Sequence, residues 1–191
     1  SILGKSDIIK TISRDQVEGF MKSFYRPDKM VFSVSGNFQE DQVLELVENH
    51  FDKLPNGQDN HSPKSIYKGG EFRQEKDLEQ VNIILGFEGV DFYSDLYYPT
   101  AVYSTVLGSG MSSRLFQEIR EKRGLVYSVS SYTSSFSDSG IFGVYAGTGQ
   151  KEVKELMPVL CDQLNICAKN FTSEELQRAK AQFKASLLMG Q

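Results

Sequence analysis

The sequence has few of the side chains that build metal or disulfide centres. It contains two histidines, two cysteines and no tryptophan. A hydrolytic zinc site needs about three protein ligands and an open position for water. His50 and His61 are separated by eleven positions, and no His-x-x-Glu-His pattern occurs in either direction. We therefore expect neither histidine to bind a metal, and no metal site in this chain.

The two cysteines, Cys161 and Cys167, fall in one predicted helix. At about 100° per residue, six residues place them on different sides of that helix and about 9 Å apart along its axis. This separation disfavours a disulfide. We expect two free, mostly buried thiols, which are typical of a reducing compartment such as the bacterial cytoplasm or the mitochondrial matrix.

The chain also lacks an excess of positive charge and any long apolar run. Its 21 Lys and Arg residues are outnumbered by 25 Asp and Glu residues, giving a formal net charge of −4. No basic block is present to neutralise phosphates, so nucleic-acid binding is not expected. No run approaches the roughly 20 apolar residues that span a bilayer. The chain starts at Ser1 without an initiator Met or a targeting peptide, and we expect an excised segment.

The most informative stretch covers residues 107–129, LGSGMSSRLFQEIREKRGLVYSV. It opens with a loop of three small residues, Gly108, Ser109 and Gly110. Glycines there permit a sharp turn or the close approach of a ligand. Ser112 is predicted to cap the following helix, and Gly124 is predicted to end it in a left-handed conformation.

Arg120 lies in the last turn of that helix and Tyr127 lies just past the reversal, so both side chains can point toward the same end of the element. A purely structural explanation also exists. Arg114 with Glu118, and Glu118 with Lys122, have the i,i+4 spacing of surface ion pairs. Arg120 can favour the negative end of the helix dipole, and Tyr127 can be a half-buried strand aromatic.

The pattern S-R-L-F-x-x-I-R-E-x-x-G-L-x-Y-S-V at residues 113–129 resembles the second half of the pitrilysin or insulinase (M16) zinc metallopeptidases. Mitochondrial processing peptidases and their bacterial relatives belong to this family. The resemblance extends from residues 12–24 through the last predicted helix. It implies an α+β fold in which helices pack on an antiparallel sheet, as part of a duplicated two-domain clamshell.

The resemblance also implies a function. Family members are zinc-dependent endopeptidases that hydrolyse peptides in a closed chamber. Their zinc ligands and catalytic glutamate lie in the first half of the protein, so zinc would be bound by an N-terminal half, in cis or in trans, and this chain alone would be inactive. Arg120 and Tyr127 match residues that reach toward the zinc site. Tyr127 would donate a hydrogen bond to the oxyanion, and Arg120 would hold a substrate carbonyl. Gly108, Ser109 and Gly110 would contribute to binding the peptide substrate.

Two other functions fit parts of the pattern. The first is a catalytically silent partner subunit of a two-chain peptidase. Such subunits often lose the Arg–Tyr pair, and their glycine loop is longer than Gly108-Ser109-Gly110. A nucleotide-binding loop is the other, because glycines before a helix can cradle phosphate. Against it, no Gly-Lys-Ser/Thr follows, and a predicted helix rather than a strand precedes the glycines.

The chain is predicted to contain two domain segments joined by a linker. Residues 1–54 read as helix, strand and helix, with a Ser13–Gln16 capping box, a strand at residues 30–34, and Asn37 capping a second helix. One short strand cannot close a sheet, so this segment needs partners, and an exposed half-domain face predicts a possible homodimer. Residues 55–65 are polar and turn-rich, as in a linker.

Residues 66–191 are predicted to form most of a second domain. Strands are expected at 72–76, 80–87, 127–136 and 141–146, with a hairpin connection at 137–140. Helices are expected at 96–107, at 152–168, and after a Thr172–Glu175 capping box. Clustered strands followed by packed helices indicate an α+β class.

Overall fold

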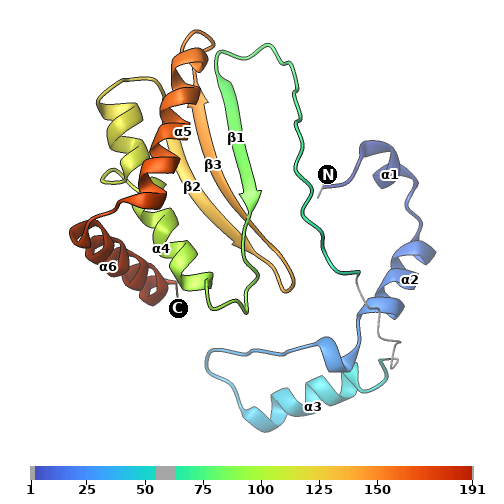
Figure 1. Ribbon diagram of the computed structural model, residues 1–191. Helices are drawn as coiled ribbons and strands as arrows, with labels where there is room; N and C mark the ends of the chain where they lie inside the picture. Colours follow the sequence, from blue (N-terminus) through green and yellow to red (C-terminus); the bar gives the residue numbers. More distant parts are fainter. Residues whose placement is uncertain (1–2, 55–62, 191) are drawn as a thin grey trace. The chain divides into compact units, whose positions relative to one another are not determined.

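The computed structural model describes residues 3–54 and 63–190 (Figure 1). The chain divides into two compact units, Ser1–Pro63 and Lys64–Gln191. Most of the predicted linker, residues 55–62, lies outside the described residues. All strands in the described part of the chain belong to the second unit.

The first unit is helical in its described residues. Its elements are α1 (Ser6–Thr11), α2 (Arg14–Phe24), the 3₁₀ turn η1 (Pro27–Lys29) and α3 (Glu40–Phe51). The predicted capping box of α2 is confirmed. The Gln16 N–H donates to Ser13 Oγ (3.2 Å), and the Ser13 N–H donates to Gln16 Oε1 (2.8 Å). These bonds satisfy backbone donors that have no partner within the helix.

Two predictions for the first unit are wrong. Residues 30–34 form no strand, and Val31 among them is 94% exposed. A strand needs a neighbouring strand to pair with, and the described part of this unit offers none. Asn37 does not cap the next helix, because α3 begins at Glu40, directly after Gln39, and has no side-chain cap.

The second unit is built on a three-stranded antiparallel sheet. Its strands are β1 (Val81–Glu88), β2 (Ser128–Ser135) and β3 (Gly140–Thr148), in the order β1-β3-β2. Leu85 of β1 pairs with Val144 of β3, and Val129 of β2 pairs with Ala146 of β3. Because side chains alternate between the faces of a strand, these four residues lie on one face of the sheet.

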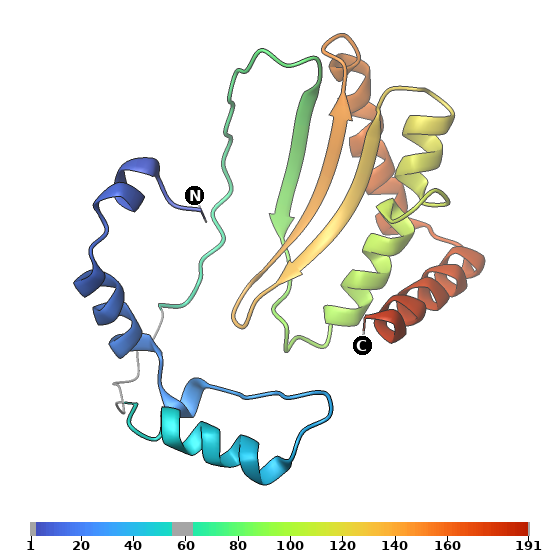
Figure 2. The ribbon, with the colours of Figure 1, turned by 180° about the vertical axis from the view of Figure 1, so that it is seen from behind.

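Helices cover that face. They are α4 (Tyr97–Gly108), α5 (Val153–Lys169) and α6 (Ser173–Met189), together with the π-helical segment η2 (Phe116–Glu121). Figures 1 and 2 show from opposite sides that α4 and α5 lie along the sheet and that α6 crosses beside α4. The most deeply buried apolar side chains of the core are Leu107, Leu115, Ile119, Val144, Ala146, Leu156, Leu160 and Cys167. The predicted α+β class is confirmed.

Most predicted elements of this unit appear within one or two residues of their expected ends. The capping box of α6 is present: the Thr172 N–H donates to Glu175 Oε2 (2.7 Å), and the Glu175 N–H donates to Thr172 Oγ1 (3.2 Å). The strand predicted at residues 72–76 is wrong. That segment joins no ladder in the described structure, and Phe72 is 85% exposed.

Candidate functional site

The loop after α4 is shaped by two glycines. Gly108 is the last residue of α4, and a Cβ placed there would lie 2.4 Å from the backbone nitrogen of Ser131 in β2. Only a residue without a side chain therefore lets α4 end this close to the sheet. Gly110 follows with a φ of +84°, which favours glycine. A sharp turn is present at these residues and at Ser109 between them. The substrate-binding role of all three stays a prediction.

The turn is closed by Ser113 rather than by Ser112. The Ser113 hydroxyl and N–H both donate to the Gly110 carbonyl, at 2.7 and 3.2 Å. The following η2 segment has no side-chain cap, so the prediction that Ser112 caps it is wrong. The Ser112 carbonyl instead accepts a bond from Arg178 Nη2 in α6, at 3.3 Å. The turn is thus tied to a helix distant in sequence.

The helix predicted after this loop is π-helical over Phe116–Glu121. The Lys122 N–H donates to the Gln117 carbonyl (3.0 Å), five residues back. π-Helical turns are uncommon and occur frequently at functional sites. Gly124, with a φ of +64°, ends the segment in the predicted left-handed conformation. The Gly124 N–H donates to the Arg120 carbonyl at 3.0 Å, so the reversal begins directly after this arginine.

Three basic side chains crowd the end of η2, and two of them are paired. Lys122 contacts Glu118, as predicted, and Arg123 Nη1 lies 3.0 Å from Glu118 Oε2. The hydrogen bond from Lys122, supported by that from Arg123, lowers the pKa of Glu118. Arg120 forms no salt bridge in the described part of the chain. Its guanidinium is exposed and lies over the Phe116 ring, 4.8 Å from the centroid. This arrangement leaves its N–H donors free for a ligand.

Tyr127 lies on the other side of the Gly124 reversal. Its backbone N–H donates to the Gly147 carbonyl (2.8 Å), which fixes it beside the end of β3. The residue is 64% exposed, so the phenol is not packed in the core. The described structure contains no hydrogen bond between the Arg120 and Tyr127 side chains. Each is presented to solvent from its own side of the turn, and their joint action stays a prediction.

The i,i+4 spacing predicted an ion pair between Arg114 and Glu118, and this prediction is wrong. The Arg114 Nε and Nη2 instead donate to the two carboxylate oxygens of Glu175, each at 2.7 Å, and Nη2 also donates to the Asn170 carbonyl at 2.5 Å. The Arg114 bonds lower the pKa of Glu175 to about 2. Sequence spacing could not reveal this pair, because the two residues are 61 positions apart.

The described residues do not fit a zinc site. No group of three His, Cys, Asp or Glu side chains in residues 3–54 or 63–190 is arranged to hold a metal. His50 is exposed at the end of α3, and His61 lies outside the described residues. Nor does any helix in those ranges combine the length and apolarity required to cross a bilayer.

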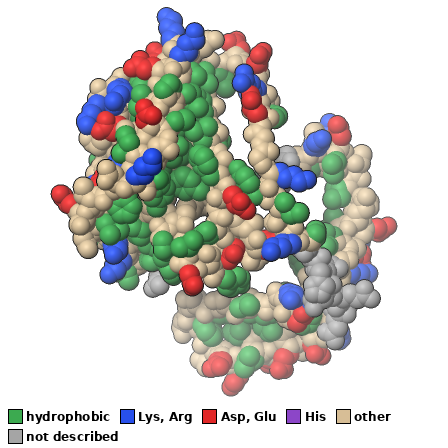
Figure 3. Space-filling view, in the orientation of Figure 1, with side chains coloured by type: hydrophobic (Ala, Val, Ile, Leu, Met, Phe, Trp, Pro, Cys, Tyr) green, Lys and Arg blue, Asp and Glu red, His purple; other side chains and the backbone are tan. Residues whose placement is uncertain are grey.

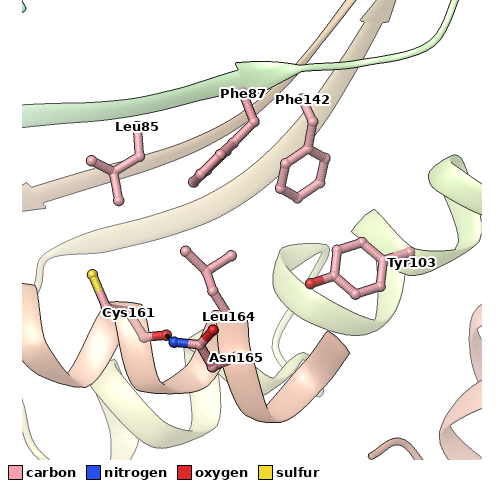
Figure 4. Close-up of a pocket in the computed structure, with 7 residues that line it drawn as sticks. All are labelled: Leu85, Phe87, Tyr103, Phe142, Cys161, Leu164 and Asn165. Atoms are coloured by element: carbon pink, nitrogen blue, oxygen red, sulfur yellow. Dashed lines mark hydrogen bonds between the residues drawn. The ribbon is translucent and has the colours of Figure 1, made fainter. Parts of the chain in front are cut away.

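An apolar cavity of about 370 Å³ lies between the sheet and helices α4 and α5, away from the glycine turn. Figure 4 shows its lining residues, with the sheet side chains pointing toward the helices: Leu85, Phe87, Tyr103, Phe142, Cys161, Leu164 and Asn165. Burial, with a contribution from the neighbouring Cys167, raises the pKa of Tyr103 to about 12. The phenol is therefore neutral at physiological pH. None of the predicted site residues lines this cavity.

The cysteine predictions are partly correct. Both thiols are free, as expected, and Cys167 is buried, but Cys161 is exposed. The difference follows from the helix period: Cys167 continues the buried stripe of Leu156 and Leu160, whereas Cys161 is one position past it.

Comparison with known proteins identifies the family of this chain. Residues 11–183 match the family described as "Peptidase M16 inactive domain". The chain belongs to the M16 peptidase family. It is 37% identical to an "Uncharacterized zinc protease" of Rickettsia bellii over 191 residues, which are 100% of this chain and 46% of that protein. It is 35% identical to "Uncharacterized zinc protease YmxG" of Bacillus subtilis over 190 residues, 98% of this chain and 46% of that protein.

Solved structures share the fold of this M16 chain. A peptidase M16 inactive domain from Pseudomonas fluorescens aligns with a TM-score of 0.77 and 23% identity, over 96% of this chain and 45% of that one. A chain of complex III2 from Candida albicans aligns with a TM-score of 0.82 and 24% identity, over 98% and 47%. The M16 chain thus spans slightly less than half the length of the relatives that it matches.

Proposed function

We propose that this chain is the substrate-contacting, C-terminal half of a zinc-dependent endopeptidase whose metal site lies in another half of the complete protein. The observation that carries the proposal is the family match over residues 11–183, together with relatives named as zinc proteases that are about twice as long. The proposal assigns the metal ligands to another part of the complete protein, because the relatives named as zinc proteases extend well beyond the matched region.

Within this proposal, Arg120 and Tyr127 are the residues that meet the peptide. Both are exposed, and they flank the same glycine reversal. Lys122 and Arg123 are engaged by Glu118, whereas the Arg120 guanidinium has only a ring beneath it. An exposed guanidinium without a carboxylate partner retains its N–H donors for a substrate carbonyl.

The Tyr127 phenol is suited to donate a hydrogen bond where charge develops on the scissile carbonyl oxygen. Its O–H group is a hydrogen-bond donor on a rigid ring. A preorganised donor of this kind typically stabilises the transition state by about 3 kcal/mol. Arg120 would hold a neighbouring carbonyl and so fix the direction of the peptide. The partners implied are a peptide substrate and an N-terminal peptidase domain in cis or in trans.

The test is a kinetic comparison in the complete protein. Tyr127→Phe removes the donor and keeps the ring, so we expect kcat to fall about 100-fold while KM stays within about twofold. Tyr93→Phe is the matched control, because Tyr93 is also exposed and lies in the loop before α4. Equal kcat values for the Tyr127→Phe variant and the parent protein would overturn the oxyanion role.

A second measurement tests the division into halves. The isolated chain should cleave no peptide, and adding the N-terminal half in trans should restore cleavage. Absence of cleavage by the complete protein would instead favour the non-catalytic partner subunit.

A further inference from the structure

An ion pair between Arg114 and Glu175 connects the beginning of η2 to helix α6. Arg114 stands between the glycine turn and η2, two residues before Phe116. Its guanidinium meets both oxygens of the Glu175 carboxylate at 2.7 Å and the Asn170 carbonyl at 2.5 Å. Two parallel N–H···O bonds fix orientation as well as distance, because both groups are planar.

This pair is largely shielded from solvent. The Arg114 side chain is 16% exposed and the Glu175 side chain is 18% exposed. Charge-assisted hydrogen bonds are stronger where water is scarce. The pairs of Glu118 are more exposed: Lys122 is 62% exposed, Arg123 is 38% exposed and Glu118 itself is 25% exposed. Among the ion pairs that residues 114–123 make in the described structure, the Arg114–Glu175 pair is therefore the one with the most fixed geometry.

Glu175 is itself held rigidly. The same carboxylate accepts a hydrogen bond from the Thr172 N–H in the capping box of α6, at 2.7 Å. This bond holds the carboxylate in place independently of Arg114. α6 also reaches the glycine turn at two further points. Arg178 donates to the Ser112 carbonyl, and Gln182 Nε2 lies 3.4 Å from the place where a Cβ of Gly110 would stand. The N-terminal half of α6, from Glu175 to Gln182, is thus a support for residues 110–114.

The geometry points to Arg114 as a positioning residue, which through Glu175 fixes the start of η2 and thereby the direction in which Arg120 is presented to a peptide. η2 has no side-chain cap of its own, and Arg120 is its fifth residue. Without the pair, its N-terminal end would keep the hydrogen bonds made by Ser113, Gln117 and Arg178 but would lose the bidentate ion pair that fixes its orientation. The kinetic consequence of this inference rests on the proposed function, whereas its effect on η2 does not.

The experiment uses the complete protein and two readouts. Glu175→Gln removes the charge but keeps an oxygen that can accept the Thr172 N–H, and Arg114→Lys keeps the charge but loses the planar fork. For both variants we expect hydrogen exchange of the Phe116–Glu121 amides to accelerate about tenfold, with exchange in α5 unchanged. Lys122→Gln, which breaks the exposed pair on the same segment, is the control and should leave exchange unchanged. Unchanged exchange in both Arg114→Lys and Glu175→Gln would overturn the inference.

A double-mutant cycle on peptide cleavage separates positioning from general stability. Glu175→Gln should raise KM about tenfold in the parent protein and have no further effect in an Arg120→Ala background, because the residue being positioned is then absent. Additive effects would overturn the positioning role. If Arg120→Ala alone leaves kcat and KM unchanged, the proposed function of Arg120 fails, and the exchange readout still decides whether the pair orders η2.

Discussion

The two units of this chain form helices by the same local rules but differ in what the helices do. α2 carries an apolar face of Val17, Phe20, Met21 and Phe24, and each of these side chains is 44–57% exposed in the described structure. None of the helices of the first unit buries a residue. The helices of the second unit bury their apolar faces against a sheet. Caps and periodicity are therefore sufficient to specify a helix, but a core needs a second layer.

The space-filling view shows hydrophobic side chains on one face of both units. Hydrophobic side chains gather beside α5 in the second unit, along the apolar cavity, and hydrophobic side chains also reach the surface of the first unit (Figure 3). In the second unit they border a packed core, whereas in the first they cover helices without one.

Matched leucine truncations test most directly whether the two units differ in having a packed core. Leu160→Ala in α5 removes a side chain that is 1% exposed and should lower the free energy of unfolding by about 3 kcal/mol. Leu44→Ala in α3 truncates a side chain that is 53% exposed and should cost less than about 0.5 kcal/mol. Urea unfolding of this chain followed by circular dichroism measures both. A large loss at Leu44 would show that the first unit has a core after all.

The two capping boxes offer a finer test. Glu175→Ala and Gln16→Ala truncate the same position of the same motif, but Glu175 also holds the shielded Arg114. We expect about 2 kcal/mol for Glu175→Ala and less than about 1 kcal/mol for Gln16→Ala, because hydrogen bonds to charged groups contribute more than neutral ones. Equal losses in urea unfolding would mean that the tertiary ion pair adds nothing to the local cap.

Acid should reduce the stabilisation that the Glu175 carboxylate contributes to the folded chain. The pKa of Glu175 is about 2 in the folded chain against 4.5 for the ordinary group, so the folded state favours the ionised form. Its stabilisation is fully present above about pH 5 and is lost as the pH falls toward 2. The gap in unfolding free energy between the parent chain and Glu175→Gln should therefore narrow from about 2 kcal/mol at pH 7 to less than about 1 kcal/mol at pH 3. A gap that is constant over this range would contradict the assignment.

Two exposed glycines should respond to alanine with opposite signs. Gly124 has a φ of +64°, so a Cβ there is strained, and Gly124→Ala should cost about 1 kcal/mol. Gly19 lies inside α2 with ordinary helical angles, and Gly19→Ala should stabilise α2 by at most about 1 kcal/mol. Apart from the adjacent residues and the backbone of the helix itself, no atom lies within 4 Å of either added Cβ, so packing against other elements does not affect the result. Thermal unfolding of both variants measures the signs.

Sequence reasoning succeeded for several local signals, although the local caps predicted at Asn37 and Ser112 are wrong. The boxes at Ser13 and Thr172, the left-handed stop at Gly124 and the β2–β3 hairpin each depend on residues a few positions apart. It failed where the outcome depends on a distant partner. The segments at 30–34 and 72–76 have strand-like sequences but no strand beside them in the described structure.

The candidate site divides in the same way. The left-handed turn at Gly124 agrees with what residues 107–129 predicted, whereas the roles of Arg120 and Tyr127 stay predictions. The π-helical form of η2 was not predicted, because its sequence has the spacing of an ordinary helix. The partner of Arg114 was missed because Glu118, four residues away, is an equally good electrostatic partner by spacing alone, and only the position of α6 decides between Glu118 and Glu175.

The place of β1 at the margin of the sheet has a practical consequence. β1 pairs with β3 along one side, and on the other side the described structure gives it a single bond, from the Tyr67 hydroxyl to the Gly86 carbonyl. Its sequence, VNIILGFE, is rich in β-formers, contains no proline and carries one charge. Such strips template pairing between molecules. The outer edge of this eight-residue strand is therefore a place where a second copy of the chain can add a strand at high concentration.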